Sequence, residues 1–217
     1  MHVRVKICGV SSVDGLECAV RHGADAIGFV FATSLRRISI SRALQLQTHL
    51  PPFVTSVAVF RHPTSDDLRS VFDQVQPDMI QAEPSPQVID FVKESETRFL
   101  PVLHDDGTVE TQLSELRAAG VPYGGILLEA AGQGGRGVAP DWDVAASLAR
   151  TVPLVLAGGL SPENVRQAIL HVKPHGVDVS SGVENAPGEK DNDRIAAFIR
   201  EARESRPESA TSILRLQ

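Results

Sequence analysis

Residues 154–182 read LVLAGGLSPENVRQAILHVKPHGVDVSSG, and this stretch decides the fold. It opens with a short apolar run, passes a turn that contains two glycines, and then shows apolar residues at helical spacing from Val165 to Val172. A second short apolar run, residues 176–179, follows and ends in another turn. The stretch therefore predicts a strand, a helix and a second strand parallel to the first.

The same alternation of apolar run, turn and helical segment occurs eight times along the chain. The runs are Val3–Cys8, Ala26–Phe31, Thr55–Phe60, Asp78–Gln81, Arg98–Leu103, Gly125–Glu129, Leu154–Ala157 and Gly176–Val179. Because most of them are apolar at nearly every position, they indicate parallel strands buried on both faces. Eight consecutive units favour a closed (β/α)8 barrel, the TIM-barrel fold. The alternative, an open doubly wound sheet, normally carries a G-x-G-x-x-G turn after its first strand, and residues 8–12 read CGVSS instead.

The length of the chain supports a single domain. Dividing 217 residues among eight units leaves about 27 for each, which suffices for a strand, a helix and two short loops but not for an inserted domain. We expect the barrel to span residues 1–205. Residues 206–217 are largely polar, and we expect them to form a tail that frays.

Composition argues against several classes of protein. The chain has 21 Lys and Arg against 27 Asp and Glu, a net charge of −6, so no basic field is available for nucleic acid. The longest apolar runs reach seven residues, as in 26–32, whereas a membrane helix needs about twenty. The first residues lack an apolar signal core, and two cysteines make neither a disulfide framework nor a zinc site. These features indicate a cytoplasmic protein.

Three residues near strand ends are candidates for chemistry, because the active site of such a barrel lies at the C-terminal ends of its strands. Cys8 ends the first run, where its thiol could act as a nucleophile or general base, or pack as a small apolar side chain. Glu129 ends the sixth run, where partial burial suits it as a general acid, although a pair with Arg136 would be equally reasonable. Asp178 lies within the eighth run and requires a polar mouth or hydrogen-bond donors.

Glycine-rich turns after the last two strands predict an anion site. They are Gly158 with Gly159, and Ser180, Ser181 with Gly182. Barrels commonly hold a substrate phosphate at these two places, since glycine lets backbone N–H groups approach an anion. We also expect a helix to start at Ser161-Pro162-Glu163, directly after the first turn, and to add its dipole.

Two further loops are candidates for substrate binding. A glycine cluster that includes Gly135 follows the sixth strand, and it either closes over a ligand or simply connects two elements. Arg36 and Arg37 follow the second strand, where a guanidinium suits a carboxylate or phosphate but is often only solvated.

Short motifs throughout the chain carry a resemblance to a known family. They are KICG at residues 6–9, GADAIGFVF at 23–31, SLR at 34–36, GGRG at 134–137, LAGGL at 156–160, PENV at 162–165 and GVDVSSGVE at 176–184. In this order they resemble the phosphoribosylanthranilate isomerase family of tryptophan biosynthesis. The family converts N-(5-phosphoribosyl)anthranilate into 1-(2-carboxyphenylamino)-1-deoxyribulose 5-phosphate by an Amadori rearrangement, without a metal or organic cofactor.

The resemblance implies roles for the candidate residues. Cys8 would remove the C2′ proton, and Glu129, the acid after strand six, would protonate the furanose ring oxygen. Arg36 would meet the anthranilate carboxylate, and the loops of Gly158-Gly159 and Ser180 to Gly182 would hold the phosphate. Asp178 matches a family acid in the same mouth.

The chain departs from the family pattern at several positions. Glu129 stands where the family usually has Asp, and residues 81–84 read QAEP where the family often has Gln-Leu-His-Gly. Arg136 replaces the usual Ser or Thr of the glycine cluster. Residues 61–62 and 104–106, after strands three and five, match no motif of the family.

The departures leave two alternatives to the isomerase. One is a barrel that binds phosphorylated metabolites with little or no catalysis. The other is the related aminoaldose isomerase of histidine biosynthesis, which would carry an aspartate where this chain has Cys8. In each case we expect a small phosphorylated ligand as partner, no nucleic acid, no membrane, and a monomer or weak homodimer.

Overall fold

The computed structural model, which describes residues 3–132 and 138–205, has eight parallel strands that close into a barrel in chain order. The strands are β1 (Arg4–Cys8), β2 (Ala26–Val30), β3 (Thr55–Val59), β4 (Met79–Ala82), β5 (Arg98–Asp105), β6 (Ile126–Ala130), β7 (Leu154–Leu156) and β8 (Gly176–Val179). The predicted (β/α)8 barrel is therefore confirmed. The predicted tail, residues 206–217, lies outside the described residues.

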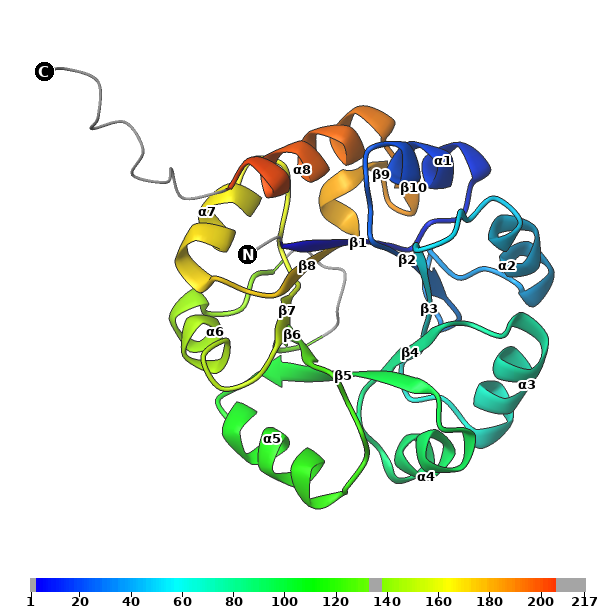
Figure 1. Ribbon diagram of the computed structural model, residues 1–217, viewed down its shortest axis with the longest axis vertical. Coiled ribbons are helices and arrows are strands. Elements are labelled where there is room, and N and C mark those ends of the chain that lie inside the picture. The colour runs from blue at the N-terminus through cyan, green and yellow to red at the C-terminus, as the bar shows by residue number, and fades with distance from the viewer. Residues whose placement is uncertain (1–2, 133–137, 206–217) are drawn as a thin grey trace, which may run out of the picture.

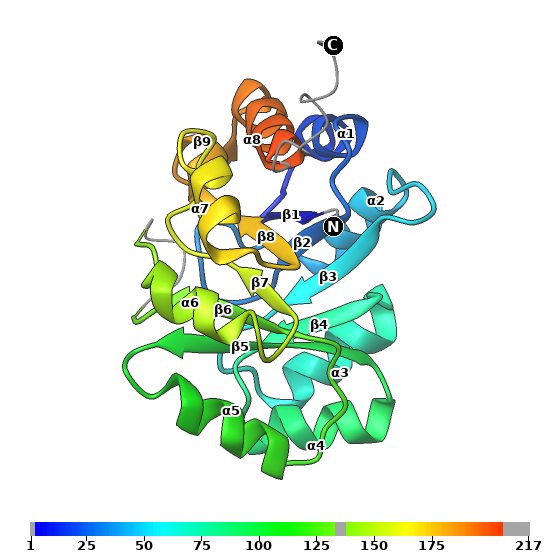
Figure 2. The ribbon, with the colours of Figure 1, turned by 60° about the vertical axis from the view of Figure 1, so that its left-hand side comes forward.

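Helices form a ring around the strands (Figure 1). They are α1 (Val13–Arg21), α2 (Ile40–Gln47), α3 (Ser65–Val75), α4 (Pro86–Ser95), α5 (Val109–Ala118), α6 (Trp142–Leu148), α7 (Val165–Val172) and α8 (Asn192–Glu204). Both ribbon views place α8 beside α1, so the last unit packs against the first (Figure 2). A short 3-10 helix, η1 (Ser181–Val183), and a small hairpin of β9 (Glu184–Ala186) and β10 (Glu189–Lys190) precede α8. Among the described helices, none is long and apolar enough to cross a membrane.

Each helix lies on the barrel with the apolar face that its sequence predicts. The expected apolar face of α7, from Val165 to Val172, is buried. The apolar face of α8, from Ile195 to Ala202, is buried in the same way. The largest apolar core lies between the outer face of the strands and these helices. A smaller cluster fills the inside of the barrel and includes Leu100, Val102 and Leu127.

The strand ends lie within one residue of the sequence-based expectation with one exception, and one helix also starts later than expected. The helix expected to start at Ser161 starts at Val165 with Asn164 as its N-cap, because residues 162–164 form a separate turn. The backbone amides of Asn164 and Val165 both bond to the Ser161 carbonyl in that turn. Strand β5 continues to Asp105, two residues past the predicted end, because its last residues pair with Glu129 and Ala130 of β6.

The turns after β7 and β8 lie in direct contact. A Cβ placed on Gly182 would overlap the carbonyl oxygen of Leu160, so only glycine permits the observed approach of the two backbones. The Asn164 side chain stabilises the first turn, with Nδ2 donating to the Gly159 carbonyl at 2.8 Å and Oδ1 accepting from the Ser161 amide at 2.8 Å. The two predicted anion-binding turns are thus one connected structure.

We expect Gly182→Ala to destabilise the protein by about 1–3 kcal/mol, because a new methyl group would force two backbones apart. The matched control is Gly124→Ala, since a Cβ at Gly124 meets no atom within 4 Å. This control should change the free energy of unfolding by less than about 0.5 kcal/mol. Urea denaturation measures both values, and equal stability of the two variants would contradict the expected overlap.

Candidate active site

A cavity of about 570 Å³ opens at the C-terminal ends of the strands. It brings together five of the residues singled out from the sequence, Cys8, Arg36, Glu129, Asp178 and Ser180. Gly135, the predicted substrate-binding residue of the glycine cluster, lies outside the described residues, as does Arg136. These five side chains therefore share one site, as the barrel interpretation requires. The other described candidates, Gly158, Gly159, Ser181 and Gly182, do not line this cavity.

Strand alternation places Cys8 inside the barrel. Lys6 and Cys8 point to the interior of β1, and Val5 and Ile7 pack outward into the large core. The neighbouring strand offers Gly28, where a Cβ would lie 3.0 Å from the Cys8 sulfur. Burial raises the pKa of the Cys8 thiol, Asp178 raises it further, and the positive charges of Lys6 and Lys190 oppose both. The buried sulfur is thus a thiol whose thiolate form depends on neighbouring cations.

A buried ion pair forms the floor of the site beneath Cys8. The Lys6 ammonium donates to Oδ1 of Asp178 at 2.7 Å, and both side chains are about 93% buried or more. Burial is the largest single influence and acts to lower the pKa of Lys6, but the charges of Asp178 and Cys8 and the hydrogen bonds to both together outweigh it, so the pKa is raised. Asp178 therefore satisfies both conditions set by its sequence, since it reaches the mouth cavity and also has a hydrogen-bond donor.

Glu129 occupies the wall of the cavity near the end of β6. Its pKa is raised, chiefly by burial and then by the negative charge of Asp178, whereas His104, Lys6 and Arg61 act to lower it. A carboxyl group in this environment holds its proton at higher pH than an exposed glutamate does. That property suits a general acid.

Arg36 is held in the mouth by Glu184. Its Nε and Nη2 donate to the two carboxylate oxygens of Glu184 at 2.7 and 2.8 Å, and the Lys190 ammonium donates to Glu184 at 2.8 Å. Burial would raise the pKa of Glu184, but these bonds and the Gly188 amide lower it to about 2. The guanidinium is therefore rigidly placed, with two of its three nitrogens used for positioning.

The predicted phosphate turn after β8 lies beside Cys8. Ser180 Oγ donates to the Cys8 carbonyl at 3.2 Å, and the Lys190 ammonium donates to the Ser180 carbonyl at 2.9 Å. In the turn after β7, Gly158 has φ +84° and a Cβ there would lie 2.6 Å from the Val138 carbonyl oxygen, so its backbone conformation and its surroundings both require glycine. The close approach of Gly182 to Leu160 joins this turn to the one that adjoins the mouth.

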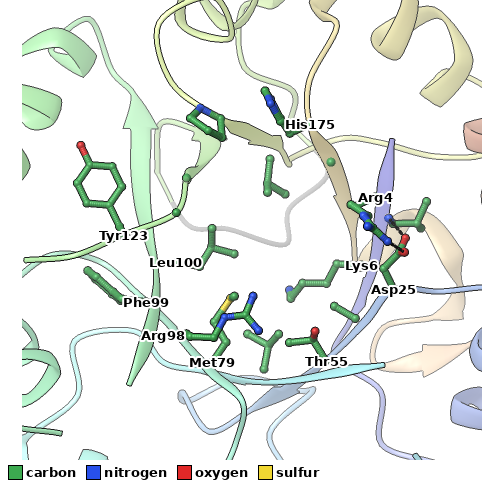
Figure 3. A pocket seen from close by; sticks show the side chains of 18 of the residues that line it. Arg4, Lys6, Asp25, Thr55, Met79, Arg98, Phe99, Leu100, Tyr123 and His175 are labelled. Atoms are coloured by element: carbon green, nitrogen blue, oxygen red, sulfur yellow. Dashed lines mark hydrogen bonds and ion pairs between the residues drawn. The ribbon is translucent and has the colours of Figure 1, made fainter. Parts of the chain in front are cut away.

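A second, larger cavity of about 860 Å³ lies at the opposite end of the barrel (Figure 3). It is lined by the first residues of the strands, including Arg4, Thr55 and Arg98, and the Arg4–Asp25 ion pair closes one edge. Catalytic residues of such barrels come from the other end of the strands. Cys8, Glu129 and Arg36 line only the smaller cavity, so we assign the chemistry there.

Several residues of the site are not indicated by the sequence pattern around them. Lys6 belongs to the KICG motif, but the motif alone does not indicate what Lys6 does. Side chains alternate along a strand, so Lys6 lies on the same face as Cys8, inside the barrel. Glu184 meets Arg36 across 148 positions, and Lys190 bonds to the same Glu184 carboxylate. No local pattern of the sequence marks the contact between Arg36 and Glu184. Gln81 also lines the mouth, and its buried Oε1 has no hydrogen-bond partner within the described ranges. Within those ranges, no group of three or more His, Cys, Asp or Glu side chains could hold a metal ion.

A closed (β/α)8 barrel whose mouth holds a thiol and a carboxyl group of raised pKa belongs to the class of barrels with a candidate acid–base site at the C-terminal ends of the strands. Residues 5–201 match the family model described as N-(5'phosphoribosyl)anthranilate (PRA) isomerase. The chain belongs to this family, and it is an isomerase of the kind that interconverts an aldose and a ketose.

Individual relatives agree with the family match. N-(5'-phosphoribosyl)anthranilate isomerase of Geotalea uraniireducens is 38% identical over 205 residues, which cover 92% of this chain and 98% of that protein. The Pseudomonas aeruginosa enzyme is 41% identical over 94% of this chain and 97% of its own length. The solved phosphoribosyl anthranilate isomerase of Thermotoga maritima superposes with a TM-score of 0.79, at 36% identity over 92% of this chain and 98% of that one.

A second solved isomerase is in complex with reduced 1-(o-carboxyphenylamino)-1-deoxyribulose 5-phosphate. It superposes with a TM-score of 0.77 at 37% identity and covers 92% of this chain and 98% of its own. These comparisons support the isomerase over the two alternatives that the sequence left open.

We expect Lys6→Met to cost about 3–5 kcal/mol of stability, because it leaves the Asp178 carboxylate buried without its cation. The double variant Lys6→Met/Asp178→Leu should regain most of that loss, since no unpaired charge remains. Lys93→Met on the exposed side of α4 serves as the control and should change stability by less than about 0.5 kcal/mol. Chemical denaturation of the four proteins tests this, and a Lys6 variant as stable as the control would contradict it.

Proposed function

We propose that the barrel rearranges N-(5-phosphoribosyl)anthranilate to 1-(2-carboxyphenylamino)-1-deoxyribulose 5-phosphate, with Cys8 as general base and Glu129 as general acid. The observation that carries these roles is that a thiol and a carboxyl group of raised pKa face the same cavity from different strands. The reaction requires two such groups, because a proton must be given at one atom of the substrate and taken from another. The ligand of the solved relative is a reduced form of the same product.

The acid step opens the sugar ring. Glu129 donates its proton to the furanose ring oxygen, the bond between this oxygen and C1′ breaks, and the nitrogen lone pair forms a C1′–nitrogen double bond. Glu129 becomes a carboxylate in this step. Its burial and the neighbouring Asp178 favour the protonated form that must be present beforehand.

The base step creates the new carbonyl. The Cys8 thiolate removes the proton from C2′, and the resulting enolamine tautomerises so that C2′ becomes the ketone. Lys6 and Lys190 lower the free energy of the thiolate, whereas burial raises it. The Lys6 ammonium therefore has a second role besides pairing with Asp178, since it stabilises the charged form of the base.

Two sets of donors would hold the two anionic ends of the substrate. The turns of Gly158-Gly159 and of Ser180, Ser181 and Gly182 would bind the phosphate through backbone N–H groups. Arg36 would bind the anthranilate carboxylate with the nitrogen that Glu184 leaves unused. The partly buried Glu184 fixes the direction of that nitrogen.

The oligomeric state and the location of the protein stay predictions. A Thermotoga maritima relative is described as a dimeric phosphoribosylanthranilate isomerase, and the monomer and the weak homodimer expected from the sequence both stand. Cys8 and Cys18 are free and buried, in keeping with the expected cytoplasmic location.

We expect Cys8→Ala and Glu129→Gln each to lower kcat by at least about 100-fold, since each removes a proton-transfer group. Cys18→Ala is the matched control and should keep full activity. Cys18 lies on α1 in the outer ring of helices, where its sulfur contacts the Asn192 carbonyl. Glu129→Asp should retain measurable activity, because it restores the acid usual in the family. Loss of substrate fluorescence, compared with uncatalysed decay, measures kcat, and normal turnover by both catalytic variants would rule out the assigned roles.

Arg36→Met should raise KM about tenfold or more, because a hydrogen bond to a charged group contributes about 1.5–3 kcal/mol. The change in kcat should be smaller, since Arg36 meets the carboxylate and not the reacting carbons. Arg37→Met, one residue along the same loop, is the control and should leave both constants unchanged. Steady-state kinetics on the three proteins measures the two constants, and a KM equal to that of the unmodified protein would contradict the role of Arg36.

A further inference from the structure

A cluster of charged side chains that matches no motif of the family lies beside Glu129. Nε2 of His104 and Oε1 of Glu83 are 3.0 Å apart, and Nδ1 of His62 lies 2.8 Å from Oε2 of the same carboxylate. Arg61 approaches Glu83 at 3.6 Å and donates to the Gly132 carbonyl at 2.9 Å. The side chains of Glu83 and His104 are each about 80% buried, so the ion pair between them is shielded from water.

Strand geometry places His104 next to Glu129. On β5, Leu100 and Val102 fill the barrel interior, and His104 lies two positions further on the same face. On β6, Leu127 fills the interior and Glu129 follows on the same face. The ladder pairs His104 with Glu129, and paired strands run about 5 Å apart. The two side chains therefore leave neighbouring strands at the same height of the mouth.

Two separate contacts fix His104 in this place. The Gln112 side chain on α5 holds its backbone, since Oε1 accepts from the His104 amide at 3.0 Å and Nε2 donates to the His104 carbonyl at 2.8 Å. Glu83 holds the imidazole itself at Nε2. A histidine that is only solvated at the surface does not require both contacts. The arrangement therefore indicates that the position of the His104 side chain matters for the function of the site.

Each member of the pair favours the charged form of the other. The hydrogen bond to Glu83 raises the pKa of His104, and the negative charges of Glu83 and Glu129 add to this against the effect of burial. The same bond lowers the pKa of Glu83. The charged groups that act on Glu129 are Asp178 from β8, Lys6 from β1, His104 from β5 and Arg61 from the loop after β3.

We propose that His104 is a positioning residue for the isomerase reaction: held as an imidazolium by Glu83, it stabilises the carboxylate that Glu129 becomes when it gives its proton to the substrate. The proposal rests on the role of Glu129 in the proposed function. It assigns a task to the two positions, 83 and 104, at which the chain has no counterpart to the family motifs. No proton passes through His104 in this scheme, because its charge alone lowers the energy of the Glu129 carboxylate.

The test compares four variants with the unmodified protein. His104→Gln removes the cation, Glu83→Gln removes the group that keeps it charged, and His104→Arg restores a permanent positive charge. His171→Gln is the matched control, since His171 also pairs with a carboxylate, that of Asp143 at 2.7 Å, but on the outer ring. Two quantities are measured in each: the protonation midpoint of Glu129, from the carbon-13 NMR signal absent in Glu129→Gln, and the pH dependence of kcat.

Removal of a nearby cation destabilises a carboxylate, so the Glu129 midpoint should move upward by about one pH unit in His104→Gln and in Glu83→Gln. A general acid works below its midpoint, so the fall in kcat on the alkaline side of Glu129 should move upward with it. At the pH optimum kcat should fall about tenfold with little change in KM. His104→Arg should restore the midpoint, and His171→Gln should leave both quantities unchanged.

An unmoved Glu129 midpoint in both His104→Gln and Glu83→Gln would overturn this inference and leave the proposed function intact. A midpoint that moves while the fall in kcat stays in place would show that Glu129 is not the acid, and both proposals would then fail. If His104→Gln does not fold, Glu83→Gln carries the same comparison, because it removes the carboxylate that favours the imidazolium form of His104 without changing that residue.

Discussion

The buried ion pair between Lys6 and Asp178 is the interaction on which the rest of the site depends. It joins β1 to β8 at the position where the barrel closes, since these two residues are partners in the ladder between the first and last strands. A buried pair is seldom more stabilising than apolar side chains of similar size. Its value here is electrostatic, because Lys6 lies beneath the Cys8 sulfur and Asp178 raises the pKa of Glu129.

Overall charge and local charge act in opposite directions in this protein. A chain of net charge −6 does not attract a ligand that carries phosphate and carboxylate. The mouth holds positive charge locally instead, since the Arg36 guanidinium and the Lys190 ammonium both bind Glu184 beside the turn after β8. Such contacts act within a few ångströms, where the long-range field of the surface matters little.

Much of the fold and part of the site could be predicted from the sequence. Apolar runs fix where strands form, and the rule that barrel sites lie at strand ends brings Cys8, Glu129 and Asp178 to one mouth. The partners of these residues escape prediction because they come from distant units. The ion pair between Arg36 and Glu184 spans 148 positions, and the pairing that extends β5 as far as Asp105 depends on the register with β6. Local propensity carries no information about either of these contacts. The sequence therefore predicts His104 in the loop after the fifth strand, whereas the structure has it on β5.

Burial has opposite consequences for the two proposed catalytic groups. It raises the pKa of Glu129, which helps an acid that must hold a proton, and it raises the pKa of Cys8, which hinders a base that must lose one. The charged neighbours act differently on the pKa of each group. Lys6 and Lys190 favour the thiolate, and Asp178 favours the protonated carboxyl.

The charges of His104 and Asp178 have opposite effects on the pKa of Glu129, since Asp178 raises it and His104 lowers it. Together they limit how strongly Glu129 holds its proton. A carboxyl group raised too far would hold its proton but release it slowly to the sugar oxygen, because proton donation weakens as the pKa rises. A nearby imidazolium lowers the energy of the carboxylate that remains after donation. Glutamate reaches one methylene further into the mouth than the aspartate usual in the family. In the proposed mechanism, the longer side chain at position 129 and the His104 imidazole, which is hydrogen-bonded to Glu83, therefore act together on one acid.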